Sequence, residues 1–147
     1  MAEILMRIMR ERDIPEVLEI ENISFSTPWS ATSFLNEIYK PYSLTNVAVL
    51  GDQIIGYICI NYIADEGHIL NLAVHPHFRR RGIAKTLAEK VLKELGENSC
   101  RYIYLEVRVS NFEARKFYEH LGFRVMGMRK NYYTMPTEDA IVMAHEL

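Results

Sequence analysis

The pattern of apolar and polar positions changes along the chain between a strand-like period of two and the helical period of 3.6. Runs rich in β-branched and aromatic residues predict seven strands, at residues 4–10, 44–50, 53–63, 68–74, 101–109, 123–131 and 138–145. Helical periodicity and capping signals predict four helices, which begin at Asp13, Ser30, Gly82 and Ser110. The third helix has one apolar stripe, made of Ala84, Leu87, Ala88, Val91 and Leu95. The order β-α-α-β-β-β-α-β-α-β-β predicts an α+β fold, with helices packed on a mixed sheet.

Individual residues predict where several of these elements begin and end. Asp13 is expected to cap the first helix, and Gly51–Asp52 predicts a hairpin turn between the second and third strands. Ser110 and Glu113 have the spacing of a capping box for the last helix. Gly96 is expected directly after the third helix, which joins the fourth and fifth strands as a parallel crossover.

Composition narrows the classes of protein that the chain can belong to. A length of 147 residues without a linker-like stretch favours one domain over residues 1–147. The first residues lack the charge order of a signal peptide, and no apolar run approaches the ~20 residues that cross a bilayer. A net charge of -2 argues against general nucleic-acid binding. Cys59 and Cys100 lack metal-ligand spacing, so we expect reduced thiols in a cytoplasmic protein and no metal.

The segment between the fourth strand and the third helix has the features of an anion-binding site. The start of a helix presents backbone N–H groups without intrahelical partners, and together with the helix dipole they attract anions. Gly82 and Ala84 would let a phosphate approach this backbone closely. Arg79–Arg81 and Lys85 add positive charge suited to a polyphosphate. The alternative is a solvated basic helix start with a glycine for a tight turn.

The spacing Arg79-x-x-Gly82-x-Ala84 resembles the R/Q-x-x-G-x-G/A signature of GNAT acetyltransferases, whose loop holds the pyrophosphate of acetyl-CoA. The resemblance extends over most of the chain. It is closest to the protein N-terminal acetyltransferases of that family, the RimI-type ribosomal-protein alanine acetyltransferases of bacteria and their archaeal relatives. The segments that carry it are 25–30 (FSTPWS), 71–74 (NLAV), 105–111 (LEVRVSN), 117–123 (FYEHLGF), 131–133 (NYY) and 138–143 (EDAIVM).

The resemblance implies a GNAT fold, in which the fourth and fifth strands splay apart and the acetyl thioester lies between them. It also implies which residues bind acetyl-CoA. Backbone groups of Leu72, Ala73 and Val74 would pair with the pantetheine arm, and Asn111 would bond the same arm or cap the last helix. The pyrophosphate would lie against Arg79, Arg80, Arg81, Gly82, Ile83, Ala84 and Lys85.

Glu106 interrupts an otherwise apolar strand. A buried carboxylate is costly unless it is paired or functional, so we expect burial to raise its pKa toward that of a general base. The alternatives are a salt bridge with Arg101 or Arg108, or a position on an exposed face of the strand. The resemblance favours the role of general base, acting through a water molecule.

Two further catalytic roles are implied by the resemblance. His68 lies where related enzymes carry a catalytic tyrosine or histidine, and it would share the proton relay with Glu106. Tyr118 matches the residue that protonates the departing thiolate, although packing in a helix–sheet core is the alternative. Neither cysteine has a neighbouring base, so we expect direct transfer in a ternary complex rather than an acyl-enzyme.

The acceptor is suggested by two aromatic segments, one with Phe25 and Trp29 and one with Tyr132 and Tyr133. They would flank a peptide and exclude internal lysines, or they are two ordinary aromatic surface patches. The family match favours the first alternative and implies a protein N-terminus as acceptor, with a ribosomal protein among the candidates. An α-amine has a pKa of about 7.7–8, against about 10.4 for lysine, so a modest base suffices. Glu21 and Glu37 are expected to be solvated helix charges, the alternative being that they attract the ammonium group of the acceptor. Acetylation of small amines or lysines, or cofactor binding without catalysis, are the alternatives.

Overall fold

The structure is a computed structural model that describes residues 3–147. Its α-helices are α1 (Ile14–Ser24), α2 (Ala31–Tyr39), α3 (Ile83–Glu97) and α4 (Phe112–His120), with 3₁₀ turns at Glu11–Asp13 and Pro76–Phe78. Its strands are β1 (Ile4–Ile8), β2 (Ser43–Leu50), β3 (Gln53–Ile63), β4 (Glu66–Val74), β5 (Tyr102–Arg108), β6 (Arg124–Tyr133) and β7 (Glu138–Glu146). The predicted order of helices and strands is therefore confirmed.

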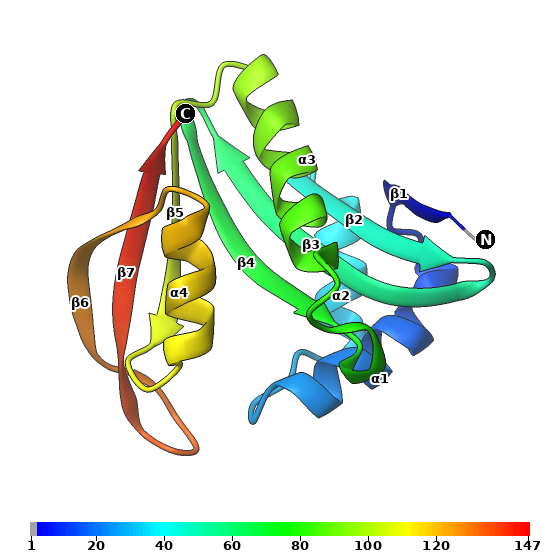
Figure 1. Cartoon of the computed structure of the whole chain (residues 1–147), viewed down its shortest axis with the longest axis horizontal. Coiled ribbons are helices and arrows are strands. Elements are labelled where there is room, and N and C mark those ends of the chain that lie inside the picture. Colours follow the sequence, from blue (N-terminus) through cyan, green and yellow to red (C-terminus); the bar gives the residue numbers. More distant parts are fainter. Residues whose placement is uncertain (1–2) are drawn as a thin grey trace.

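The strands of this part of the chain form one sheet in the order β1-β2-β3-β4-β5-β7-β6 (Figure 1). Neighbouring strands are antiparallel except β4 and β5, which are parallel as the crossover through α3 requires. Their pairing runs only from Glu66↔Tyr102 to His68↔Tyr104. Beyond His68 the two strands diverge (Figure 1), so the predicted α+β fold and the splay between the fourth and fifth strands are confirmed.

Two hydrophobic cores, one on each face of the sheet, hold the helices. On one face α3 buries the predicted stripe of Leu87, Ala88, Val91 and Leu95, and α4 contributes Tyr118. On the other face α1 and α2 pack on β2 and β3. Full burial of one such aliphatic side chain contributes about 1.5–3 kcal/mol, so these faces fix the helices against the sheet.

Asp13 lies at the predicted N-cap position of α1, but its side chain does not cap that helix. The carboxylate instead pairs with Arg7 at 2.7 Å and accepts a hydrogen bond from the Arg10 N–H at 2.8 Å. The prediction of a side-chain cap was wrong because a strand arginine and the preceding turn offer stronger, charged and local partners for the same carboxylate.

The predicted boundaries of the last two helices also differ from the observed ones. The N-cap of α4 is Asn111, whose Oδ1 accepts from the Ala114 N–H at 3.1 Å, so the predicted capping box of Ser110 and Glu113 is wrong. The Ser110 N–H is instead bonded to a carboxylate of β7. Gly96 lies inside α3, because the backbone reverses only after Asn98, the C-cap of α3.

Candidate active site

A cavity of about 550 Å³ opens where β4 and β5 diverge. Its lining comes from the end of α1 and the loop that follows, from β4 and β5, from α4 and from the end of β6. The lining residues are Glu21, Ser24, Phe25, Ser26, Thr27, Trp29, His68, Ile69, Leu70, Asn71, Leu72, Leu105, Glu106, Val107, Arg108, Asn111, Ala114, Tyr118, Tyr132 and Tyr133.

The backbone edge of β4 forms one wall of this cavity. The five consecutive residues His68–Leu72 all line it, although successive side chains of a strand point to opposite faces. They do so because the edge of β4, from Ile69 onward, pairs with no strand on the β5 side within residues 3–147. Unpaired backbone groups inside a sheet are a ready partner for an extended ligand.

Glu106 and His68 face each other across the point where the strands separate. His68 Nε2 lies 3.0 Å and 2.9 Å from the two carboxylate oxygens of Glu106, and the Tyr132 hydroxyl donates to Glu106 Oε1 at 3.0 Å. The imidazole also stacks on Tyr104, with ring centroids 4.2 Å apart. The Glu106 side chain is only 5% exposed, so its partners rather than water determine its charge.

The pKa of Glu106 is lowered, contrary to the expectation from the sequence. Burial alone raises the pKa of this carboxyl, but the hydrogen bond and charge of His68 lower it. The hydrogen bond from Tyr132 and the charge of Arg129 lower it further, and together these contributions outweigh burial. The alternative of a salt bridge with Arg101 or Arg108 does not apply, because the observed partner is His68. Glu106 is therefore an ionised carboxylate at neutral pH.

Tyr118 and Asn111 bring α4 to the cavity. Tyr118 is buried between Phe117 and Phe123, with ring centroids 5.1 Å and 5.5 Å away, and it also lines the cavity. Burial raises the pKa of its phenol above the ordinary value. The hydroxyl is therefore protonated throughout the physiological range and can act only as a donor or a neutral acceptor. Asn111 lines the cavity while its side chain caps α4.

Glu21 is a second carboxylate at the cavity. It was expected to be a solvated helix charge, but it is 1% exposed. Its oxygens accept hydrogen bonds from the Tyr57 hydroxyl, from Asn71 Nδ2 at 2.8 Å and from the Trp29 N–H at 2.9 Å. No sequence signal links donors so far apart in the chain. The glutamate therefore ties α1, β3, β4 and the following loop together.

Glu37 was also expected to be solvated, and it too is buried, at 3% exposed. It lies away from the cavity lining and accepts from Ser43 and Lys40. Both helix carboxylates are buried because strand side chains, together with a loop N–H or a nearby lysine, satisfy them, and helical periodicity cannot reveal the strand partners.

The two aromatic segments line the same cavity. Phe25 and Trp29 line it from the loop between α1 and α2, and Tyr132 and Tyr133 line it from the end of β6. Trp29 also packs on Phe34 with centroids 5.1 Å apart, so its ring is partly committed to the core of α2.

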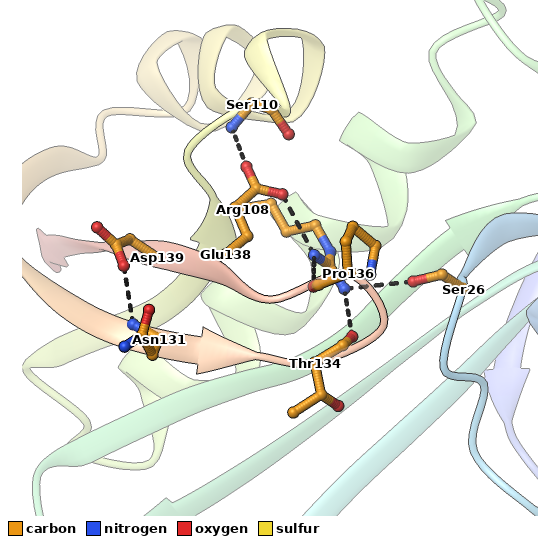
Figure 2. Close-up of polar contacts among 8 residues, drawn as sticks. All are labelled: Ser26, Arg108, Ser110, Asn131, Thr134, Pro136, Glu138 and Asp139. Atoms are coloured by element: carbon orange, nitrogen blue, oxygen red, sulfur yellow. Dashed lines mark hydrogen bonds and ion pairs between the residues drawn. The ribbon is translucent and has the colours of Figure 1, made fainter.

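Arg108, two residues beyond Glu106 on β5, connects these segments (Figure 2). Its guanidinium donates to the Ser26 hydroxyl at 3.2 Å and to the carbonyls of Thr134 and Pro136 at 3.1 Å and 2.9 Å. It also pairs with Glu138 at 3.2 Å. One side chain therefore joins the loop after α1 to the β6–β7 hairpin, and the residue patterns predicted no such contact.

The basic loop before α3 lies outside the lining of the cavity, as do Ala73 and Val74. Gly82 has φ +79°, a left-handed conformation that favours glycine, and a Cβ there would meet no atom within 4 Å. The first helical bond runs from the Thr86 N–H to the Gly82 carbonyl, so the N–H groups of residues 83–85 have no intrahelical partner. Arg80, Arg81 and Lys85 are exposed here.

Arg79 does not extend freely into solvent. Its Nε donates to the Val74 carbonyl at 2.9 Å, and its terminal nitrogen donates to the Ser24 hydroxyl at 3.2 Å. The side chain thus holds the basic loop against the end of β4 and α1. Both cysteines are buried, and burial raises the pKa of each thiol.

Residues 3–147 contain no group of three or more side chains suited to bind a metal ion. Nor does any helix in this range have the length and apolar character to cross a membrane.

Comparison with known proteins agrees with this geometry. Residues 14–123 match the Acetyltransferase (GNAT) family. Over 141 residues the chain is 36% identical to the ribosomal protein bS18-alanine N-acetyltransferase of Salmonella typhimurium, and the match covers 93% of each chain.

Two solved structures are similar over nearly their whole length. One is the ribosomal-protein-S18-alanine N-acetyltransferase from Escherichia coli, with TM-score 0.90, 30% identity and coverage of 98% of this chain and 94% of that chain. The other is Ard1 from Thermoplasma volcanium, with TM-score 0.91, 27% identity and coverage of 98% and 97%. Since the family match spans most of the chain and the relatives are covered almost completely, this protein belongs to the GNAT family of acetyltransferases, which use acetyl-CoA.

Proposed function

We propose that this protein transfers the acetyl group of acetyl-CoA to the α-amino group at the N-terminus of a protein. The observation that carries the proposal is the position of the Glu106–His68 pair, at the point where the open edge of β4 begins and in the cavity that both aromatic segments line. An extended acetyl donor on that edge and a peptide between the aromatic segments would meet at this pair.

The residues present fit acetyl-CoA. The open edge of β4 at Leu72, Ala73 and Val74 suits the amide groups of the pantetheine arm. The left-handed Gly82 and the free N–H groups of residues 83–85 leave room and donors for the pyrophosphate, with charge from Arg80, Arg81 and Lys85. In this proposal Arg79 acts by holding the loop in place, and Asn111 lies beside the same arm.

Acetyl-CoA supplies a thioester whose carbonyl carbon forms the new C–N bond and whose C–S bond breaks. The attacking amine must first lose its proton, and the ionised Glu106 with His68 accepts that proton, directly or through a water. The pKa of Glu106 is below its ordinary value, so it is a weak base on its own. An α-amine with a pKa of about 7.7–8 needs only ~1 kcal/mol for deprotonation at neutral pH, which makes a weak base sufficient.

Tyr118 is proposed to donate its proton to the departing thiolate. The side chain lines the cavity from α4 and packs with Leu105 and Val107, on the face of β5 opposite to the one that carries Glu106. Because burial raises the pKa of the phenol, the proton is fully present at neutral pH before transfer. Glu106 and Tyr118 thus divide the work of base and acid between two walls of the cavity.

The acceptor is proposed from the two aromatic segments together with the relatives. Phe25, Trp29, Tyr132 and Tyr133 would contact the first residues of a peptide, and a passage between two walls favours a chain end over an internal lysine. The Salmonella relative acts on the alanine of ribosomal protein bS18, so a ribosomal protein in the cytoplasm is the first acceptor to test.

The test is a panel of acceptors with release of free CoA thiol as the readout. It contains peptides with free N-termini, among them one beginning with alanine, the same peptides with blocked N-termini and an internal lysine, and small amines. We expect turnover on the free N-termini and little on the blocked peptides. Turnover on small amines or lysines alone would contradict the proposal.

A further inference from the structure

Tyr132 and Tyr133 are consecutive residues at the end of β6, yet both line the cavity. In a regular strand their side chains would point to opposite faces of the sheet. The Tyr132 hydroxyl nevertheless reaches Glu106, while the Tyr133 ring lies 4.5 Å from the Arg108 guanidinium. The centroids of the two rings lie only 5.0 Å apart, whereas side chains on opposite faces of a strand diverge, so the backbone here departs from a regular strand.

The register between β6 and β7 locates this irregularity. Arg129 pairs with Ala140 and Tyr133 pairs with Glu138, and the pairing is irregular between these two positions. Four steps along β6 therefore correspond to two steps along β7. The additional residues of β6 form a bulge opposite Asp139. Bulges of this kind redirect side chains and are common beside active sites.

Asp139 holds this bulge from the opposite strand. Its Oδ1 accepts a hydrogen bond from the Asn131 N–H at 2.8 Å (Figure 2). Asn131 has φ +54°, a left-handed conformation that costs free energy for most residues and is best tolerated by asparagine or aspartate among non-glycine residues. The carboxylate thus satisfies an N–H group within the bulge, where the β6–β7 pairing is interrupted.

We propose that Asp139 is a positioning residue whose carboxylate fixes the bulge that directs Tyr132 at Glu106. The inference rests on the proposed function, because it assigns Asp139 a part in the same site. Asp139 acts only through Tyr132. Its neighbour Glu138 performs a separate task, since it binds Arg108 and the Ser110 N–H.

The proposal is tested with Asp139→Ala, Asp139→Asn, Tyr132→Phe and the double variant Asp139→Ala/Tyr132→Phe. Asp139→Ala should lower kcat on an N-terminal peptide about as much as Tyr132→Phe, on the order of 10-fold, and leave KM for acetyl-CoA unchanged. Asp139→Asn keeps an acceptor oxygen and should restore kcat to within about 3-fold of wild type. Lys130→Ala, an exposed position in the same bulge, is the matched control and should behave as wild type.

The double variant separates positioning from general stability. If Asp139 acts through Tyr132, adding Asp139→Ala to Tyr132→Phe should change kcat by less than about 2-fold. Multiplied losses would overturn the proposal, and so would an Asp139→Ala enzyme with wild-type kcat. Absence of peptide turnover by the wild-type enzyme would instead reject the proposed function.

Hydrogen exchange tests the same proposal in the wild-type protein, so the test does not require any variant to fold. In the wild-type protein the Asn131 amide should be protected from hydrogen exchange, as expected for a bonded N–H. Exchange at the rate of an exposed loop would overturn the assignment of Asp139. We further expect the Asn131 amide to remain protected in Asp139→Asn and to lose its protection in Asp139→Ala.

Discussion

Two carboxylates line the same cavity, and their surroundings differ in one decisive respect. Glu21, on α1, accepts from a backbone N–H, an amide and a phenol, none of which exchanges a proton near neutral pH. Glu106, on β5, has His68 as its main partner, and a histidine can gain or lose a proton in that range. Both are largely shielded from water, with Glu21 1% exposed and the Glu106 side chain 5% exposed, so burial alone does not account for the difference between them.

The type of donor therefore decides what each of these buried carboxylates can do. Fixed donors turn Glu21 into a junction of four segments, including the loop that carries Trp29. A titratable donor gives Glu106 a route for a proton, and the unpaired edge of β4 begins beside it. The variants below test whether this division between structure and chemistry is correct.

The largest effect is expected for Glu106→Gln. Glutamine fills the same space but accepts no proton, so kcat should fall by about 10²–10⁴-fold with little change in KM for acetyl-CoA. Steady-state kinetics on an N-terminal peptide measures this, with thermal unfolding as the check on folding. A kcat within a few-fold of wild type would remove Glu106 from the chemistry.

Glu21→Gln should lower stability and leave kcat nearly unchanged, the reverse of the result expected for Glu106→Gln. The amide NH₂ would oppose the Trp29 N–H, a donor against a donor, which leaves a buried group without a partner and costs about 1–3 kcal/mol. For a chain of this size we expect Tm to fall by roughly 2–4 °C per kcal/mol, as calorimetry can measure. A loss of kcat as large as that of Glu106→Gln, with Tm unchanged, would contradict the comparison.

A smaller effect on binding is expected for Arg108→Met. The substitution keeps much of the side-chain volume but removes the bonds to Ser26 and to the β6–β7 hairpin, so the walls around the peptide should loosen. KM for the peptide should rise about 10-fold, equivalent to about 1.4 kcal/mol, with KM for acetyl-CoA unchanged. Arg101→Met, before β5, is the matched control and should change neither constant. Equal increases in both constants would show a general distortion instead.

The smallest effect concerns stability in acid. Folding lowers the pKa of Glu106, so the ionised carboxylate stabilises the folded state. This stabilisation is fully present above the unfolded pKa of about 4.3 and is lost as pH falls through the lower folded pKa. Glu106→Gln lacks this group, so its free energy of unfolding should decrease less than that of wild type between about pH 6 and pH 3. Urea unfolding at several pH values measures the difference. Parallel curves would mean that folding leaves the pKa of Glu106 unshifted.

Local patterns were sufficient for most of the fold. The stripe of Leu87 to Leu95 predicted α3, and Gly51–Asp52 predicted the turn between β2 and β3, because both depend on neighbours in the chain. The cap of α4 was misassigned because Ser110 and Asn111 are adjacent candidates, and a distant carboxylate on β7 takes the Ser110 N–H.

Sequence patterns alone predict the order of elements, the basic loop before α3 and Glu106 as a polar residue in an apolar strand. These are short-range properties of periodicity, turn chemistry and charge. Only the tertiary structure decided that the pKa of Glu106 is lowered rather than raised, that Glu21 is buried and that Arg108 joins the two walls. Each depends on donors brought together from separate strands and loops, and their hydrogen bonds outweigh the effect of burial that the sequence alone suggests.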